Sequence, residues 1–538
     1  MANWAPGDGT DPGDQAAGPT SMKPLFTIAT AVWDTPADQL AGTIASVKGQ
    51  LFTGWEWVLV DNASTNRDAR HLVRAAAAGD RRIRVIERQR PGSLEAVGND
   101  AVRVARGDFL VFLDAGDTLA RGTLQIAADA IAAQPDVDFL YSDEDRLFED
   151  GRRGDPFRKG EWSPERLRCQ NYVGHLSIAR ARLVRAVGAY RSGFEGAEDH
   201  DLVLRVTERA RRVVHLAHLL YHRRANGPGP GGDAGQSTRS AGCGAVAAHL
   251  ARVGIGGTVD PGRVAGTYRI ARDPLPGARV SVVIPTRGSR GRVWGTERVL
   301  VLRAVRSLLQ KAGTTPVEVV VVYDLDTPSE VLAQLRAVKP RGLVLVPFRG
   351  PFNFSAKCNA GFTASTGNVI VLMNDDLEII SEGFVDTLIG PLGEDDVGMT
   401  GARLLFSDAT IQHAGLSFST KRLYHVYRGR IDEDPGPFGA LAVNREASGL
   451  TAACVALRRE TYSEVGGLTE ALPVNFNDVD LSYKVRAAGK RLVWLADARA
   501  YHFESQTRQT LVRQWEPDII HARWNVPEQD LYIPELRS

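Results

Sequence analysis

The chain has 538 residues, too many for one ordinary domain and enough for two or three. Its content of 43% hydrophobic and 24% charged residues is typical of a globular protein. The formal net charge of +1 argues against a nucleic-acid partner, because such binders usually carry a basic surplus or stripe.

The cysteines and the apolar runs indicate the cellular setting. None of the four cysteines stands in a C-x-x-C pair, so a reduced, cytoplasmic protein is the simplest interpretation. No apolar run approaches 18 residues, and we expect no membrane span. Residues 1–23, rich in Gly, Pro, Asp and Ala, lack a signal-peptide pattern and predict a disordered tail.

From residue 24 the chain alternates apolar strand patterns with helical patterns. Strands are predicted at 26–32, 56–61, 83–87, 109–113 and 138–142, and helices at 37–49, 68–78, 93–105 and 120–133. This alternation predicts an α/β domain over 24–225, with a mainly parallel central sheet and helices on both faces. Ligands of such sheets bind outside the carboxyl ends of the strands.

A Gly/Pro-rich linker and bridging segment follows at 226–277, with a helix predicted near 241–253 and a short β segment after it. A second sheet begins with "RVSVVIPT" at 279–286. We expect a second α/β domain at 278–508 and a C-terminal extension at 509–538.

The second domain repeats the first. "GNDAVRVARGDFLVFLDAG" (98–116) aligns without gaps with "CNAGFTASTGNVIVLMNDD" (358–376), which places Asn99 on Asn359. "EGAEDHDLVLRV" (195–206) likewise corresponds to "NFNDVDLSYKVRAAG" (475–489). Four such landmarks in one order indicate a domain that occurs twice.

Asp61 and Asp324 each follow a predicted strand. One reading makes them solvated acids or turn caps. The other makes them acceptors of hydrogen bonds from a nucleobase or ribose at the sheet edge.

Clustered acids in "FLDAGD" (112–117) and "LMNDDLE" (372–378) repel one another after a buried strand. A divalent cation such as Mg²⁺ or Mn²⁺ resolves that repulsion, although a polar turn is the plain alternative. His222 and His502 each lie roughly 23 residues after an acid of the repeated stretches at 195–206 and 475–489. Each is either a satisfied core histidine or a further metal ligand.

The stretches at 195–206 and 475–489 each contain acids with two different expected roles at the start of a predicted helix. Asp201 and Asp480 suit capping and the helix dipole. Asp199 and Asp478 would then face a substrate as general bases.

Both copies resemble the catalytic domain of family 2 glycosyltransferases, which have the nucleotide-diphosphosugar GT-A fold. The matching stretches are "VDNAS" and "VVYDLD", "LDAGD" and "LMNDD", "AEDHDL" and "FNDVDL", and "YHRR" and "YHFES". "FNFSAKCNAG" and "IQHAG" in the second copy are similar to bacterial O-antigen and surface-polysaccharide transferases, including rhamnosyltransferases. The resemblance extends from about residue 25 to about residue 508.

The resemblance implies a role for each matched residue. Asp61 and Asp324 would bind the nucleotide base, and Asp199 and Asp478 would deprotonate the acceptor hydroxyl, with inversion at the anomeric carbon. The residues expected to bind the nucleotide sugar are Asp61, Asn99, Asp114, Thr286, Asp324, Asn359 and Asp375. Those expected to hold Mg²⁺ or Mn²⁺ on the diphosphate are Asp114, Asp117, His222, Asp376 and His502.

The two copies depart differently from the Asp-x-Asp pattern of the family. Its last acid falls on Asp376 in the second copy but on Gly116 in the first, where Asp117 stands one position later. The first metal set is therefore expected to be the weaker.

We expect a bifunctional transferase that moves sugars from UDP-, dTDP- or GDP-linked donors to a growing, lipid-linked surface or cell-wall polysaccharide, one linkage per domain. A cytoplasmic protein acting at the inner face of the membrane fits this function. In one alternative only the second domain is catalytic and the first positions the acceptor. In another, the chain is a non-catalytic glycan-binding or scaffold protein.

Overall fold

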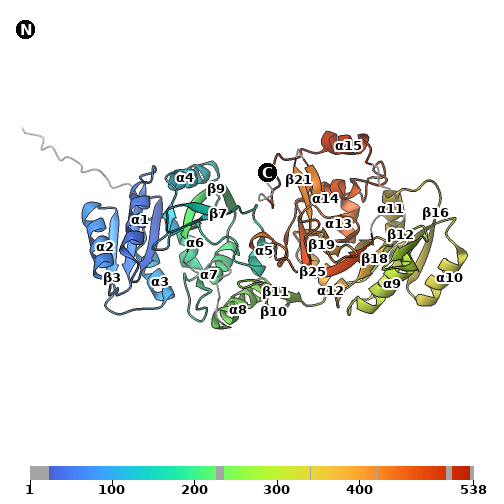
Figure 1. Ribbon diagram of the computed structural model, residues 1–538, viewed down its shortest axis with the longest axis horizontal. Coiled ribbons are helices and arrows are strands. Elements are labelled where there is room, and N and C mark those ends of the chain that lie inside the picture. Colours follow the sequence, from blue (N-terminus) through green and yellow to red (C-terminus); the bar gives the residue numbers. More distant parts are fainter. Residues whose placement is uncertain (1–22, 226–235, 340, 420–421, 504–511, 534–538) are drawn as a thin grey trace, which may run out of the picture.

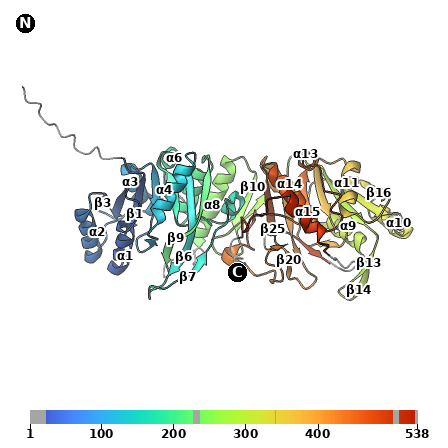
Figure 2. The same ribbon diagram turned by 90° about the horizontal axis from the view of Figure 1, so that it is seen from above.

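The computed structural model describes residues 23–225, 236–339, 341–419, 422–503 and 512–533. Two α/β halves lie end to end along the long axis of the molecule (Figures 1 and 2). The predicted tail, apart from residue 23, and the Gly/Pro-rich stretch 226–235 fall outside the described residues.

The first half contains every strand and helix predicted there, to within a few residues. Its elements are β1 (Phe26–Val32), α1 (Ala37–Lys48), β2 (Trp55–Asp61), α2 (Arg67–Gly79), β3 (Ile83–Glu87), α3 (Leu94–Val104), β4 (Phe109–Phe112), β5 (Thr118–Leu119), α4 (Thr123–Ala133), β6 (Phe139–Leu147), β7 (Arg153–Phe157), α5 (Pro164–Cys169), β8 (Ser177–Arg180), α6 (Ala181–Ala186), α7 (Glu198–Thr207) and β9 (Val213–Arg224).

The bridging segment and the second half continue the alternation. The bridge consists of α8 (Gln236–Arg252), β10 (Gly257–Pro261) and β11 (Tyr268–Arg272). The second half comprises β12 (Val280–Thr286), β13 (Arg290–Val293), β14 (Thr296–Val299), α9 (Leu300–Lys311), β15 (Val317–Asp324), α10 (Ser329–Val338), β16 (Leu343–Phe348), α11 (Phe354–Ala364), β17 (Val369–Met373), β18 (Leu377–Ile379), α12 (Phe384–Ile389), the 3₁₀ helix η1 (Gly390–Gly393), β19 (Val397–Leu405), β20 (Ile411–His413), β21 (Leu416–Ser419), β22 (Arg422–His425), the 3₁₀ helix η2 (Pro437–Gly439), β23 (Arg445–Glu446), β24 (Cys454–Arg458), α13 (Arg459–Glu464), α14 (Asn477–Ala487), β25 (Arg491–His502) and α15 (Trp515–Arg523).

The two main sheets share one strand order. The first runs β3-β2-β1-β4-β8-β6-β9-β5, and the second runs β16-β15-β12-β17-β24-β19-β25-β18. In each sheet the first four strands are parallel, and β8 or β24 is antiparallel to both of its neighbours. This match confirms the predicted mainly parallel α/β fold and the repeat, and it shows that both sheets also contain antiparallel strands.

Alternation along the central strands divides each core into two layers. In β1, Phe26 and Ile28 pack with α1, α2 and α4, whereas Ala29 packs with α3 on the opposite face. In β12, Val282 faces α9, α10 and α12, and Val283 faces α11, α13 and α14. Strands covered on both faces read as continuous apolar runs, which explains why the sequence revealed them.

The bridging segment packs into the core of the first domain. Val246 of α8 and Tyr268 and Ile270 of β11 are buried in one cluster with Leu202 of α7. At the other end of the chain, Ile520 of α15 packs on α14 of the second domain. The bridge and the extension are therefore structural parts of the two domains.

Buried charges join the two domains. Glu165 of α5 accepts hydrogen bonds from Arg272 at 2.7 and 2.8 Å and from Arg168 at 3.0 Å. Both arginines also contact Glu394 of the second domain, at 2.9 Å.

In the part of the chain that the structure describes, no helix is both long and apolar enough to cross a membrane.

Candidate active sites

Both candidate sites lie at the carboxyl ends of the parallel strands. Asp61 ends β2 and Asp324 ends β15, and the acidic clusters follow β4 and β17. Because β1 pairs in parallel with β2 and β4, and β12 with β15 and β17, these acids gather at one edge of each sheet.

A buried lysine organises the strand ends of the second domain. Lys357 of α11 donates from Nζ to Asp324 Oδ1 and to the carbonyl oxygen of Thr286, each at 2.7 Å. Thr286 Oγ1 in turn donates to Asp375 Oδ2 at 2.5 Å. Burial and the neighbouring Asp376 raise the pKa of Asp375 to about 7. One lysine therefore connects the predicted base-binding acid with the strand that carries the acidic cluster.

Asp376 and His502 face each other in the second domain, as the motif predicts. His502 Nε2 lies 3.1 Å from Asp376 Oδ1 and 3.1 Å from Asn374 Nδ2, and Nδ1 lies 2.6 Å from Gln412 Oε1. Strand pairing fixes this arrangement, because Leu377 of β18 lies opposite His502 of β25.

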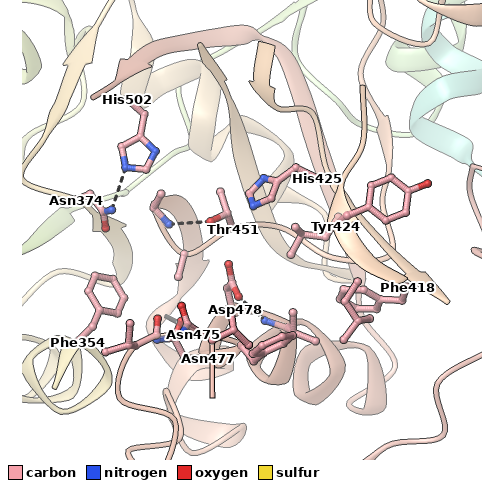
Figure 3. Close-up of a pocket in the computed structure, with 18 residues that line it drawn as sticks. Phe354, Asn374, Phe418, Tyr424, His425, Thr451, Asn475, Asn477, Asp478 and His502 are labelled. Carbon is pink, nitrogen blue, oxygen red and sulfur yellow. Dashed lines mark hydrogen bonds between the residues drawn. The ribbon is translucent and has the colours of Figure 1, made fainter. Parts of the chain in front are cut away.

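Asp478 lines the same cavity, of about 270 Å³, as Asn374 and His502 (Figure 3). It lies at the start of α14, where Oδ1 accepts a hydrogen bond from the backbone N–H of Val479 at 2.8 Å. Burial raises the pKa of Asp478, opposed by a hydrogen bond from Thr451. A carboxylate with a raised pKa is a stronger proton acceptor, as a general base requires.

A histidine pair reaches this cavity through one of its two rings. His413 Nδ1 lies 2.9 Å from His425 Nδ1, and His425 lines the cavity (Figure 3). Burial lowers the pKa of both rings, that of His425 to about 4. Both imidazoles are therefore neutral near pH 7.

The first-domain cavity, of about 510 Å³, contains a different set of side chains. Asp114, His175, Asp199 and Arg223 all line it. Asp114 is 67% exposed, with Oδ2 3.4 Å from His175 Nε2. Tyr190 donates its hydroxyl hydrogen to Asp199 Oδ1 at 3.0 Å, and burial raises the pKa of Asp199. The predicted base of this copy therefore also faces a cavity beside a strand-end acid.

The first-domain metal set of Asp114, Asp117 and His222 is not brought together. Asp117 is 6% exposed and accepts hydrogen bonds from the Tyr221 hydroxyl and the Arg224 backbone N–H, both at 2.7 Å. His222 Nδ1 lies 2.7 Å from Asp145 Oδ1, and its Nε2 lies 3.0 Å from Arg153. His222 does not line the cavity.

Strand register explains this correction. Thr118 of β5 pairs with His222 of β9. The counterpart of Thr118 in the second copy is Glu378, but the residue that pairs with His502 is Leu377, one position earlier. Arg223 is therefore the counterpart of His502, and His222 points to the opposite face, because side chains alternate along a strand. The separation of 279 residues between Asp199 and Asp478 also separates Arg223 from His502, a signal present in the sequence.

The remaining predicted residues already have protein partners. Asp61 is buried and accepts from the Ser64 backbone N–H at 3.0 Å. Asn99 exchanges hydrogen bonds with the backbone of Tyr190 at 2.8 and 3.0 Å. Asn359 holds Leu468 in the same way, at 2.9 and 3.1 Å. These two amides position the loops that precede α7 and α14.

The two domains fit a divalent cation differently. Across the described residues, no three His, Cys, Asp or Glu side chains converge as a ready-made metal site. Asp376 and His502 suit such an ion once donor oxygens and water complete the shell. Within the described part, Asn374 Oδ1 is also buried without a hydrogen-bond partner. In the first domain Asp114 and His175 lie 3.4 Å apart, and the cationic Arg223 lines the same cavity, which disfavours a metal cation there.

Sequence reasoning assigned no role to His175, Arg223, Lys357 or His425. Lys357 lies within "FNFSAKCNAG", so the motif contained a signal for it. His175 precedes β8 and has no such signal, because the matching position before β24 is Ala453. Only the fold brings it to the cavity.

The repeated sheet, with an acidic cluster after β4 or β17 and a cavity-lining acid at the start of α7 or α14, defines the GT-A class of α/β domains. Comparison with family models agrees for each half. Residues 27–188 match Glycosyl transferase family 2, and residues 276–524 match Glycosyltransferase like family 2. The chain therefore belongs to glycosyl transferase family 2, with two domains in tandem.

Relatives cover both domains together. The O-antigen biosynthesis protein RfbC of Myxococcus xanthus is 34% identical over 96% of this chain and 40% of its own length. The uncharacterized protein y4gI of Sinorhizobium fredii is 36% identical over 90% of this chain and 54% of its own length. The chain thus spans about half the length of these two relatives or less. Among solved structures, S. aureus TarS 1-349 in complex with UDP-GlcNAc matches with a TM-score of 0.35 and 18% identity, covering 42% of this chain and 66% of that one.

Proposed function

We propose that each domain transfers a sugar from a nucleotide-diphosphosugar donor to a growing surface or cell-wall polysaccharide, one linkage per domain. The observation that carries this proposal is the repeated juxtaposition of an acid at a helix start with a strand-end polar cluster in one cavity. Asp199 lies with Asp114, and Asp478 with Asn374 and His502. Membership of family 2 and the O-antigen relative support the substrate class.

In the proposed reaction of the second domain, the acceptor hydroxyl oxygen attacks the anomeric carbon while the bond to the donor diphosphate breaks. The hydroxyl proton passes to the Asp478 carboxylate, and the configuration at carbon inverts. Asp324 and Lys357 hold the nucleotide end of the donor, and Asp376 and His502 would hold Mg²⁺ or Mn²⁺. Such an ion offsets the negative charge that develops on the leaving diphosphate.

A second candidate deserves equal testing, because the first-domain metal set is not assembled. In it, only the second domain transfers a sugar and the first positions the acceptor.

Release of nucleoside diphosphate from a panel of UDP-, dTDP- and GDP-sugars, with polysaccharide fragments as acceptors, tests both candidates. Asp199→Asn and Asp478→Asn should each remove a different linkage. An unchanged product pattern with Asp199→Asn would favour the single-site enzyme. No release from any donor, with or without an acceptor, would favour a non-catalytic glycan-binding protein.

A further inference from the structure

The geometry of the first cavity points to a donor site that works without a metal. We propose that the guanidinium of Arg223 binds the donor diphosphate in the first domain, at the position where His502 and Asp376 would hold a cation in the second. This inference rests on the proposed use of nucleotide-diphosphosugar donors by the first domain.

Arg223 occupies the register position of His502 and lines the cavity with Asp114 and Asp199. Gly116 of the first copy corresponds to Asp376 of the second, so the first copy lacks that carboxylate. Arg223 corresponds to His502, so a permanently charged guanidinium takes the place of an imidazole. Both changes lower the affinity for Mg²⁺ and raise the affinity for an anion.

Arg223 lies among other charged side chains at the cavity wall. Glu144, which also lines the cavity, has Oε2 3.0 Å from Nζ of the buried Lys159 and accepts from the His175 backbone N–H at 3.1 Å. Arg223 affects the ionisation of both Glu144 and Lys159, so the three charges lie close together. Arginine also matches phosphate oxygens with two parallel N–H donors.

The other expected metal ligands of the first domain already have buried protein partners. Asp117 accepts hydrogen bonds from Tyr221 and Arg224, and His222 contacts Asp145 and Arg153. A metal would have to break these buried contacts to gain its ligands. Binding the diphosphate through Arg223 disturbs none of them.

Two measurements on the full chain test this inference, with inorganic pyrophosphate as the probe. Calorimetry in excess EDTA should detect one pyrophosphate site, and Mg²⁺ should add a second. Electron paramagnetic resonance should count one bound Mn²⁺ per chain with pyrophosphate present, and none after Asp376→Ala and His502→Ala are combined.

Variants then assign the EDTA-resistant site. Arg223→Met should weaken it by about tenfold or more, the usual effect of losing charged hydrogen bonds, and Arg223→Lys should restore part of the affinity. Arg153→Met is the matched control, since Arg153 contacts His222 on the other face of β9, and should leave binding unchanged. Melting curves show whether each variant is folded. If Arg223→Met does not fold, the Mn²⁺ count on the wild type still tests whether the first domain binds the diphosphate without a metal.

Two bound Mn²⁺ per chain, or a first-domain site that binds pyrophosphate only with Mg²⁺, would overturn the inference and leave the proposed transfer intact. An Arg153→Met effect equal to that of Arg223→Met would also overturn it. If neither domain binds pyrophosphate even with Mg²⁺, the proposed donor class fails, and the inference fails with it.

Discussion

At the scale of single residues, Asp478 and Asp480 lie two positions apart in α14 and face different surroundings. Asp478 faces the cavity. Asp480 is fully buried and accepts hydrogen bonds from the Thr469 hydroxyl at 2.6 Å and from Trp524 Nε1 at 2.9 Å. Similar side chains thus differ in position, one lining the cavity and one holding α15 against the domain.

We expect Asp478→Asn to lower turnover by the second domain by roughly 10²–10⁴, because an amide cannot accept the acceptor proton. Affinity for the donor should change little. The rate of the wild-type domain should rise with pH through the raised pKa of Asp478, and the variant should lose that rise. Steady-state kinetics across pH measures both effects. Asp480→Asn is the control and should lower the melting temperature while the folded enzyme keeps its turnover. Wild-type turnover in Asp478→Asn would reduce Asp478 to a helix cap.

His502 and His222 form a second matched pair at the residue scale. Excess EDTA should abolish transfer by the second domain, and His502→Gln should raise the Mg²⁺ concentration for half-maximal transfer by about tenfold or more. His222→Gln should leave transfer by the first domain as insensitive to EDTA as in the wild type, because His222 faces Asp145 and Arg153. Metal titrations of each linkage separate the two histidines. Equal sensitivity of both linkages to the two substitutions would contradict the register argument.

At the scale of elements, α7 is held to α5 by a buried neutral histidine. His200 Nε2 lies 2.7 Å from the carbonyl oxygen of Leu167, so Nε2 must carry the hydrogen. Within the described residues, Nδ1 is buried and has no hydrogen-bond partner. A second proton would have no acceptor there, and burial lowers the pKa of His200 to about 4.

This pKa makes the stability of the first domain depend on pH. The unfolded chain takes up the proton near pH 6.5, but the folded protein resists it until about pH 4, so stability falls as the pH drops through this range. At pH 5 the loss attributable to His200 should be about 2 kcal/mol. His200→Gln can still donate to Leu167 and should lack this component. Urea unfolding at pH 7.5 and pH 5 compares the two proteins, and parallel losses would contradict the assignment.

At the scale of the whole molecule, charges and aromatic rings fix the two domains together. Phe157 of β7 stacks on Phe438 of η2 with ring centroids 4.0 Å apart. Glu165 lies between Arg168 and Arg272, and both arginines reach Glu394. The interface thus sets the relative position of the two cavities.

We expect Glu165→Ala to destabilise the protein by about 3–5 kcal/mol, because it leaves two buried arginines without this carboxylate. Asp136→Ala removes an exposed ion pair with Arg212 and serves as the control, with little effect expected. Urea unfolding followed by fluorescence compares the two variants. A small effect of Glu165→Ala would mean that Glu394 alone satisfies the arginines.

The elements, the repeat and the family could be predicted from the sequence, because these depend on local patterns. Buried parallel strands read as apolar runs, and the acids after β4 and β17 follow directly from the strand ends. The cavity positions of Asp199 and Asp478 also followed from their place at a helix start. These features can be read from the sequence because each depends on residues that are close together in the chain.

Only the tertiary structure decided which side chains share a cavity. A shift of one residue in the pairing of β5 with β9 exchanges His222 for Arg223, because successive side chains of a strand point to opposite faces. His175 and Lys357 reach the sheet edge from segments distant in the sequence. The sequence therefore specifies two transferase domains of one family, whereas strand register and long-range packing make their two sites chemically different.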